Sequence, residues 1–185
     1  MLTRSLILAL SFGMTFATPR SSSHDPEQLL PVYGGSGGTS FSRDCGAGKV
    51  LTGLRSRGGL LVDAIGLLCR PVAADGTLGS QSTVGTLAGG GGGTSGTISC
   101  AIGAVAYHAN ISHGSYVNGV SLTCKPWNAA KREVLGQAAS AGSTKGSLTG
   151  TINLETCESP KQPMVGIRGR ASWLVDAIGF ICDEP

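Results

Sequence analysis

The sequence contains few of the residues that build long helices. Glutamate, lysine and glutamine are scarce, and charged residues make up 14% of the chain, whereas 30 of the 185 residues are glycine. A glycine inside a helix costs roughly 1 kcal/mol relative to alanine, so this composition disfavours long helices. It favours short strands joined by glycine-rich turns, and we predict an all-β fold.

The chain also lacks a long apolar run beyond its first residues. Residues 1–17 combine Arg4, an apolar stretch and small residues ahead of a cut after Ala17, which is the pattern of a secretory signal peptide. No later stretch approaches the roughly eighteen apolar residues of a membrane-spanning helix. We therefore predict a secreted, extracellular protein with no membrane span, in which residues 18–32 form a flexible leader and residues 33–185 form one domain.

Neither a strong charge nor a metal motif is present. Removal of residues 1–17 leaves 13 basic residues (14 minus Arg4) against 11 acidic ones, a net charge of +2, which indicates no nucleic-acid partner. No CxxC pair occurs, so no metal site is predicted. The six cysteines form an even set, and in an exported chain such a set indicates disulfides.

The most informative pattern is an internal repeat. A shift of 55 residues lays GGSGGTSFSRDC (34–45) on GGGGGTSGTISC (89–100). The segment LTGLRSRGGLLVDAIGLLC (51–69) has its counterpart in VGIRGRASWLVDAIGFIC (165–182). The chain is therefore interpreted as three copies, at about 33–70, 88–125 and 142–183, with the third starting near Gly142.

Each copy contains its own pair of cysteines. Six cysteines allow fifteen connectivities, and pairing within a copy is the simplest of them. This hypothesis predicts the bridges Cys45–Cys69, Cys100–Cys124 and Cys157–Cys182.

Two strands of a half-buried antiparallel sheet are predicted in each copy, separated by a short turn. In the first copy, Val62 and Ala64 alternate with Asp63 and Ile65, which is typical of a strand with one buried face. One such sheet cannot bury its apolar face alone. Three sheets packed around a pseudo-threefold axis would share one core.

The combination of a GGSGG-type loop at the start of a copy and a Gly-x-x-x-Asp turn before Ala-Ile-Gly resembles the jacalin-related, mannose-type lectins, particularly their griffithsin-like members. The resemblance covers most of residues 33–183. It implies a β-prism of three four-stranded antiparallel sheets with a pseudo-threefold repeat. It also implies a non-enzymatic protein that binds carbohydrate and needs no cofactor.

In that family the loop of one copy lies beside the turn of the preceding copy. Carried over, the resemblance implies one carbohydrate site made of Gly34, Gly35, Gly38, Ser172, Trp173, Leu174 and Asp176. It implies a second made of Gly59, Leu60, Leu61, Asp63, Gly89, Gly90 and Gly93. A carboxylate that accepts two neighbouring sugar hydroxyls, with backbone N–H groups as donors, is the chemistry that this set offers.

The third site, at Asn118, departs most from the pattern. A neutral amide replaces the carboxylate, and the loop assigned to it, GSTKG at 142–146, lacks the glycine doublet, so we expect this site to be weak. Ser172 stands where the turn pattern has glycine, so a backbone with positive φ is not expected at this position. Leu60 stands where an aromatic residue is common.

Several alternatives remain open from the sequence. Asp63 and Asp176 can serve only to cap their turns, and the glycine loops can be plain spacers. The prism can then be a structural or effector scaffold for a protein partner. The four arginines near the turns, Arg55, Arg57, Arg168 and Arg170, are interpreted as solvated or paired with acids.

Catalysis has little support, and one modification site is predicted. His108 and His113 lack acidic partners and are spaced wrongly for two ligands on one face of a strand. We therefore predict that the chain is not an enzyme. Asn110-Ile-Ser112 is a sequon, so Asn110 is a predicted glycosylation site in a eukaryotic secretory pathway.

Overall fold

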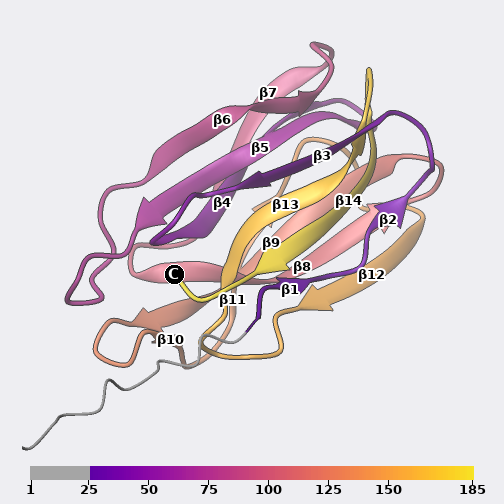
Figure 1. Cartoon of the computed structure of the whole chain (residues 1–185). Helices are drawn as coiled ribbons and strands as arrows, with labels where there is room; N and C mark the ends of the chain where they lie inside the picture. The colour runs from indigo at the N-terminus through magenta and orange to yellow at the C-terminus, as the bar shows by residue number, and fades with distance from the viewer. Residues whose placement is uncertain (1–25) are drawn as a thin grey trace, which may run out of the picture.

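The computed structural model describes residues 26–185, and the predicted signal peptide lies outside this range. The described chain forms three antiparallel sheets and contains no helix (Figure 1). No segment between residues 26 and 185 is therefore a helix that could cross a membrane. The prediction of an all-β fold is confirmed.

Each sheet is built on one long hairpin. The first sheet has the order β6 (Ser82–Gly89), β5 (Val62–Pro71), β4 (Lys49–Gly58), β7 (Thr94–Ser99). The second has β10 (Glu133–Val134) and β11 (Ala139–Ser143) on β9 (Val117–Asn128), followed by β8 (Ala104–His113) and β12 (Thr151–Thr156). The third has β1 (Gln28–Leu29) and β2 (Tyr33–Gly34) on β14 (Val175–Cys182), followed by β13 (Met164–Ala171) and β3 (Thr39–Asp44).

The three sheets thus share one plan of four strand positions. In the second and third sheets the outer position beside the hairpin is divided between two short strands. The predicted prism of three four-stranded antiparallel sheets is the architecture observed.

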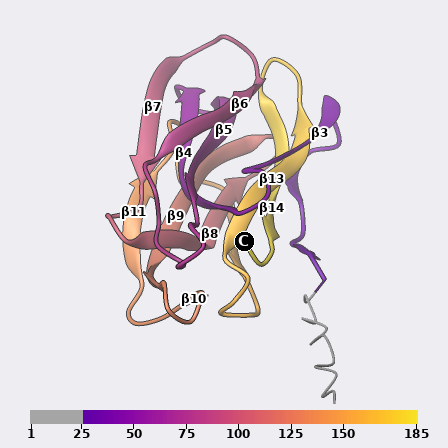
Figure 2. The same cartoon turned by 60° about the vertical axis from the view of Figure 1, so that its left-hand side comes forward.

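The strands of one sheet come from more than one copy. In the first and second sheets the fourth strand, β7 or β12, precedes the hairpin of the next sheet along the chain. The third sheet joins both ends of the chain, because the indigo strands β1–β3 pair with the yellow hairpin β13–β14 (Figure 1). In Figure 2 the tip of that hairpin and the β6–β7 loop lie at one end of the molecule, and β10 lies at the other.

The prediction of a flexible leader over residues 18–32 is wrong for residues 26–32, which the structure describes. Residues 28–29 form β1, which pairs with Cys182 and Ile181, and the Leu30 side chain is buried. The Leu30 carbonyl accepts a hydrogen bond from Arg168 Nη2 at 2.8 Å. The segment is ordered because the outer edge of β14 would otherwise leave its backbone groups without partners.

One core lies between the three sheets. Its largest fully buried side chains come from all three hairpins: Leu51, Leu54, Ile65, Leu67, Ile111, Leu122, Ile167, Ile178 and Phe180. No sheet has an apolar face that is buried by its own strands alone. The core therefore requires all three copies.

The predicted alternation along β5 is wrong. Val62 and Ile65 were expected on opposite faces, yet both belong to the core. The register of β4 and β5 shifts between Arg57–Ala64 and Gly58–Val62, so Asp63 is an extra residue in β5. Such a β-bulge changes the face on which the following residues lie.

Glycines let other segments cover the outer faces of the hairpins. A Cβ on Gly66 would lie 2.8 Å from Leu87 Cδ2, and one on Gly179 would lie 2.3 Å from the Pro31 carbonyl oxygen. Because both faces of the strand are covered, all eight residues of β14 are buried. The sequence of a strand buried on both faces is a continuous run of apolar residues, without alternation of apolar and polar residues.

The three disulfides connect neighbouring sheets. The bonded pairs are Cys45–Cys69, Cys100–Cys124 and Cys157–Cys182, which confirms the pairing within copies. In each pair the first cysteine follows the last strand position of one sheet, and the second lies in the hairpin of the next sheet. Each bridge therefore joins two sheets at a corner of the prism.

Removal of one corner bridge should destabilise the whole prism. For the Cys100→Ala/Cys124→Ala variant we expect a loss of about 3 kcal/mol in the free energy of unfolding, because the bridge closes a 24-residue separation. Urea unfolding followed by circular dichroism measures this loss. Since the three bridges occupy equivalent corners, the other two double variants should show similar losses; an unchanged unfolding midpoint would contradict a stabilising role.

Candidate functional site

The three hairpins share a feature at the same position near their turns. Asp63, Asn118 and Asp176 are each the extra residue of a β-bulge, because the pairing skips them in all three hairpins. A bulge redirects one side chain without disturbing the rest of the ladder. The three bulges thus place chemically related side chains at equivalent positions of the prism.

The loop of residues 34–38 lies directly on Asp176. The Gly35 N–H donates to the Asp176 backbone carbonyl at 2.8 Å. A Cβ on Gly37 or Gly38 would lie 2.4 Å from Asp176 Oδ1 or Oδ2. Only a chain without side chains at these positions can approach the carboxylate so closely.

The loop of residues 89–93 repeats this arrangement on Asp63. The Gly90 N–H donates to the Asp63 backbone carbonyl at 2.9 Å. A Cβ on Gly92 or Gly93 would lie 2.5 or 2.6 Å from the two carboxylate oxygens. The structure therefore brings together the loop and turn that the family resemblance paired, at both aspartates.

Backbone conformation gives a second reason for glycine in these loops. The first and last residues have positive φ in both: 135° and 63° at Gly34 and Gly38, and 118° and 59° at Gly89 and Gly93. Residues other than glycine rarely adopt a positive φ, so the loop shape depends on glycine at its ends.

An arginine holds each of these two loops. Arg57 donates from Nε to the Gly92 carbonyl at 2.9 Å and from Nη2 to the Gly93 carbonyl at 2.8 Å. Arg170 makes the same two bonds to the carbonyls of Gly37 and Gly38, both at 2.7 Å. Since the C=O and N–H of a trans peptide point in opposite directions, each arginine also fixes where the loop N–H groups point.

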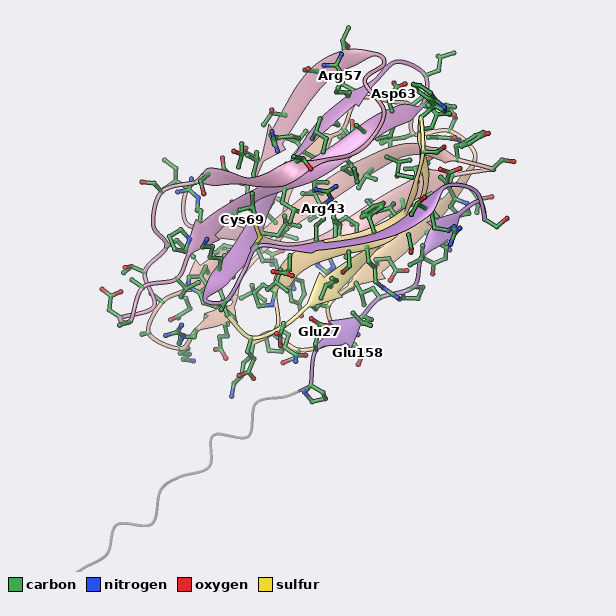
Figure 3. All side chains as sticks on the ribbon, turned by 45° about the horizontal axis from the view of Figure 1, so that its top comes forward. Glu27, Arg43, Arg57, Asp63, Cys69 and Glu158 are labelled. Carbon is green, nitrogen blue, oxygen red and sulfur yellow. A yellow bond between two sulfur atoms is a disulfide. The ribbon has the colours of Figure 1, made fainter. Side chains whose placement is uncertain are left out.

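The sequence interpretation missed this role of the arginines. The sequence predicts solvated arginines or arginines paired with acids, yet Arg57 and Arg170 donate to loop carbonyls. The signal was present in the repeat, because Arg-x-Arg precedes the turn in the first and third copies. Figure 3 shows Arg57 and Asp63 near one another at one end of the prism.

Neither turn depends on its aspartate for closure. The turns are closed by backbone bonds, from Gly59 N to the Leu61 carbonyl at 3.2 Å and from Ser172 N to the Leu174 carbonyl at 2.9 Å. Among residues 26–185 no hydrogen bond reaches the half-buried Asp63 carboxylate. A capping role for this side chain is therefore not supported.

Asp176 is more enclosed than Asp63. Its exposed fraction is 3%, and its Oδ2 accepts a long hydrogen bond of 3.4 Å from Ser172 Oγ. The doubt about Ser172 is removed, because none of the residues at this turn position, Gly59, Gly114 and Ser172, has a positive φ. The serine fits the turn and covers one oxygen of the aspartate.

The third loop is residues 146–150, not 142–146 as expected. The Ser147 N–H donates to the Asn118 carbonyl at 2.8 Å, as Gly35 and Gly90 do in the other copies. Gly146 and Gly150 have the positive φ values of the loop ends, 123° and 92°. Gly142 lies on β11, where its nearest neighbour is Ile98 rather than Asn118.

Two side chains of the Asn118 hairpin bind the backbone of the third loop. Asn118 Nδ2 donates to the Thr149 carbonyl at 2.6 Å, and Ser112 Oγ donates to the same oxygen. Ser112 occupies the position of Arg57 and Arg170, as its pairing opposite Gly119 shows. This copy has neither a free carboxylate nor an arginine holding the loop.

The remaining residues predicted for the sites lie at the hairpin tips. Leu60 and Trp173 are the most exposed of them, at 83% and 85%. Leu61 and Leu174 supply the carbonyls that close the turns. The tips thus carry exposed apolar side chains in both hairpins that have an aspartate.

His108 and His113 each contact a polar side chain of the neighbouring strand β12. His108 Nδ1 lies 2.8 Å from Thr156 Oγ1, and burial, together with the nearby Lys125, lowers its pKa. His113 Nε2 lies 2.9 Å from Asn153 Oδ1. No cluster of potential metal ligands occurs in the part of the chain that the structure describes.

The predicted sequon lies in the middle of a sheet. Asn110 is half-buried on β8, between Ser121 of β9 and Leu154 of β12, and its Nδ2 lies 3.3 Å from Ser121 Oγ. Ser112 of the sequon is fully buried. Glycosylation of Asn110 stays a prediction.

The candidate sites are shallow. Two surface hollows of about 600 and 570 Å³ lie beside them: Arg170 lines the first, with Phe41 and Arg168, and Gly59 lines the second, with Lys145. Neither aspartate lines them. A ligand at the half-buried Asp63 would therefore bind at the surface of the prism.

The arginine contacts generate a local prediction. Lysine cannot make the two parallel bonds of a guanidinium, so Arg57→Lys should loosen the 89–93 loop. We expect faster amide hydrogen exchange at residues 90–94 and unchanged exchange at residues 35–39, which Arg170 holds. Equal exchange at both loops in the variant and the parent would show that the arginine does not order the loop.

Comparison with known proteins finds similarity in structure but not in sequence. No family profile and no curated protein sequence matches the chain. Among solved structures, the chain is similar to Malaysian banana lectin, with 19% identity, a TM-score of 0.59, and coverage of 86% of this chain and 100% of that one. The chain is also similar to a mannose-binding jacalin-related lectin from Ananas comosus. The identity is 22%, the TM-score is 0.59, and the match covers 86% of this chain and 99% of that one.

A third similar structure is the Calsepa lectin in complex with a biantennary N-glycan, with 17% identity, a TM-score of 0.60, and coverage of 87% and 99%. The coverage shows that the similarity extends over almost the entire length of each lectin. The chain has the β-prism fold of the jacalin-related lectins.

Proposed function

We propose that this chain is a secreted, non-catalytic carbohydrate-binding protein that recognises hexose hydroxyls at Asp63 and Asp176. The observation that carries the proposal is the contact between each aspartate and a glycine loop whose backbone is fixed by an arginine. Two of the similar structures support it, since one is named mannose-binding and another was solved with an N-glycan. We take a mannose-type hexose as the ligand.

The chemistry of the two sites fits a sugar. Neighbouring hydroxyls of a hexose each donate and accept, and a carboxylate can accept two of their protons in charge-assisted bonds. The N–H groups of the loop can donate to the hydroxyl oxygens without the cost of ordering a long side chain. Fixed loop geometry therefore favours binding, even at a shallow surface.

The two sites should differ in strength. The Asp63 carboxylate is half-buried and has no hydrogen-bonding partner among residues 26–185, whereas Asp176 is buried and accepts a hydrogen bond from Ser172 Oγ. We expect the Asp63 site to bind more tightly. The Asn118 loop is closed, so useful avidity would come from two sites on one glycan surface.

A scaffold for a protein partner is the second candidate. The closed loop at Asn118 favours it, because a loop without a free acceptor has lost the chemistry of the other two. This candidate predicts a stable, secreted prism that binds no glycan.

Glycan-array binding of residues 18–185 separates the candidates. Asp63→Asn should lower the affinity at least about tenfold, because a hydrogen bond to a charged group contributes about 1.5–3 kcal/mol. Asp176→Asn should have a smaller effect, and the double variant should not bind. Asn118→Ala serves as the matched control and should bind within about twofold of the parent.

All variants must first show oxidised cysteines and melting temperatures near that of the parent. Binding by the double variant would move the site away from the aspartates. A folded parent that binds no glycan would favour the protein scaffold.

A further inference from the structure

Trp173 is unusually exposed for its residue type. Its side chain is 85% exposed at the tip of the β13–β14 hairpin, whereas tryptophan is on average highly buried. The equivalent tip residues are Leu60 and Ser115, so the indole is the only aromatic ring at this position in the three described hairpins. It is not needed to close the turn, which the Ser172–Leu174 backbone bond does.

The turn that carries Trp173 contacts both candidate sites. On one side Ser172 Oγ lies 3.4 Å from Asp176 Oδ2. On the other side the backbone of Trp173 packs against the loop of the Asp63 site, since a Cβ on Gly90 would lie 2.4 Å from the Trp173 carbonyl oxygen and 3.0 Å from its Cα. The indole therefore starts from a backbone that separates the two sites.

The same packing occurs once more without an aromatic residue. A Cβ on Gly35, in the loop of the Asp176 site, would lie 2.2 Å from the Ser115 carbonyl oxygen of the neighbouring tip. Each loop thus lies between the turn of its own sheet and the tip of another. Only the tip at Trp173 has a retained aspartate on both sides, because Ser115 belongs to the hairpin of Asn118.

We infer that Trp173 is a wall shared by the Asp63 and Asp176 sites, and that these sites together recognise an oligosaccharide rather than an isolated hexose. This inference rests on the proposed function. A pyranose has an apolar C–H face that packs on a flat aromatic ring, while its hydroxyls remain free for the carboxylate and the loop. A chain of hexoses that leaves one aspartate would meet the indole before it reaches the other.

Gly90 has a specific role in this arrangement. Any side chain there would collide with the Trp173 backbone, so this glycine sets how closely the loop of one site approaches the wall of the other. Sequence pairing placed Trp173 only with Asp176. The packing also places its backbone beside the loop of Asp63.

Tryptophan fluorescence tests the shared wall, because the chain has two tryptophans. Trp127 lies on β9, where its Nε1 donates to the Gly76 carbonyl at 2.8 Å, and it contacts the core rather than the sites. A Trp127→Phe variant makes Trp173 the only indole reporter. An α-linked mannotriose is the probe, with binding measured in parallel by calorimetry.

In the Trp127→Phe/Asp176→Asn variant only the Asp63 site remains. We expect mannotriose to bind and to change the Trp173 emission, because the indole borders that site too. The matched Trp127→Phe/Asp63→Asn variant should show the change through the Asp176 site. Adding both aspartate substitutions should abolish it.

Affinity provides the second measurement. Trp173→Ala should weaken mannotriose binding about fivefold, Trp173→Phe should restore part of the loss, and methyl mannoside should be affected less than the trisaccharide. If mannotriose binds calorimetrically to the Asp63-only variant while Trp173 emission stays constant, the shared wall is refuted and the proposed function survives. If the folded parent binds no mannotriose, the proposed mannose-type function fails, and the inference fails with it.

Discussion

The close approach of a glycine backbone to a bulged acidic residue is the contact on which the candidate sites depend. At Asp63 and Asp176 the loop comes so near the carboxylate that a Cβ would lie about 2.4–2.6 Å from its oxygens. The bulge turns the acid toward the loop, the positive φ of the end glycines bends the loop back, and an arginine fixes its carbonyls. The prism beneath keeps these parts in register.

That prism has one core shared by three sheets. The core takes side chains from every hairpin, each fourth strand links one sheet to the next copy, and each disulfide joins two sheets at a corner. Within this frame the three loops can diverge separately. Replacement of arginine by Ser112 and of aspartate by Asn118 closes one loop on itself, while the other two keep their acids.

Much of the fold follows from the sequence, because a repeat leaves a strong signal. The three hairpins and their cysteine pairs could be predicted from residues in register, and the family resemblance implied the loops at the two aspartates. Three features could not. The bulges break the alternation that identifies a strand face, the third loop lies four residues later than the glycine pattern indicates, and the order of residues 26–32 depends on pairing with the distant β14.

Amide NMR during a titration with methyl mannoside tests the central claim most directly, because it reports every loop separately in one folded protein. We expect shifts at residues 35–38 and 90–93, the latter saturating at lower sugar concentration, and none at residues 147–150. Shifts confined to residues 147–150, or to strands remote from all three loops, would contradict it.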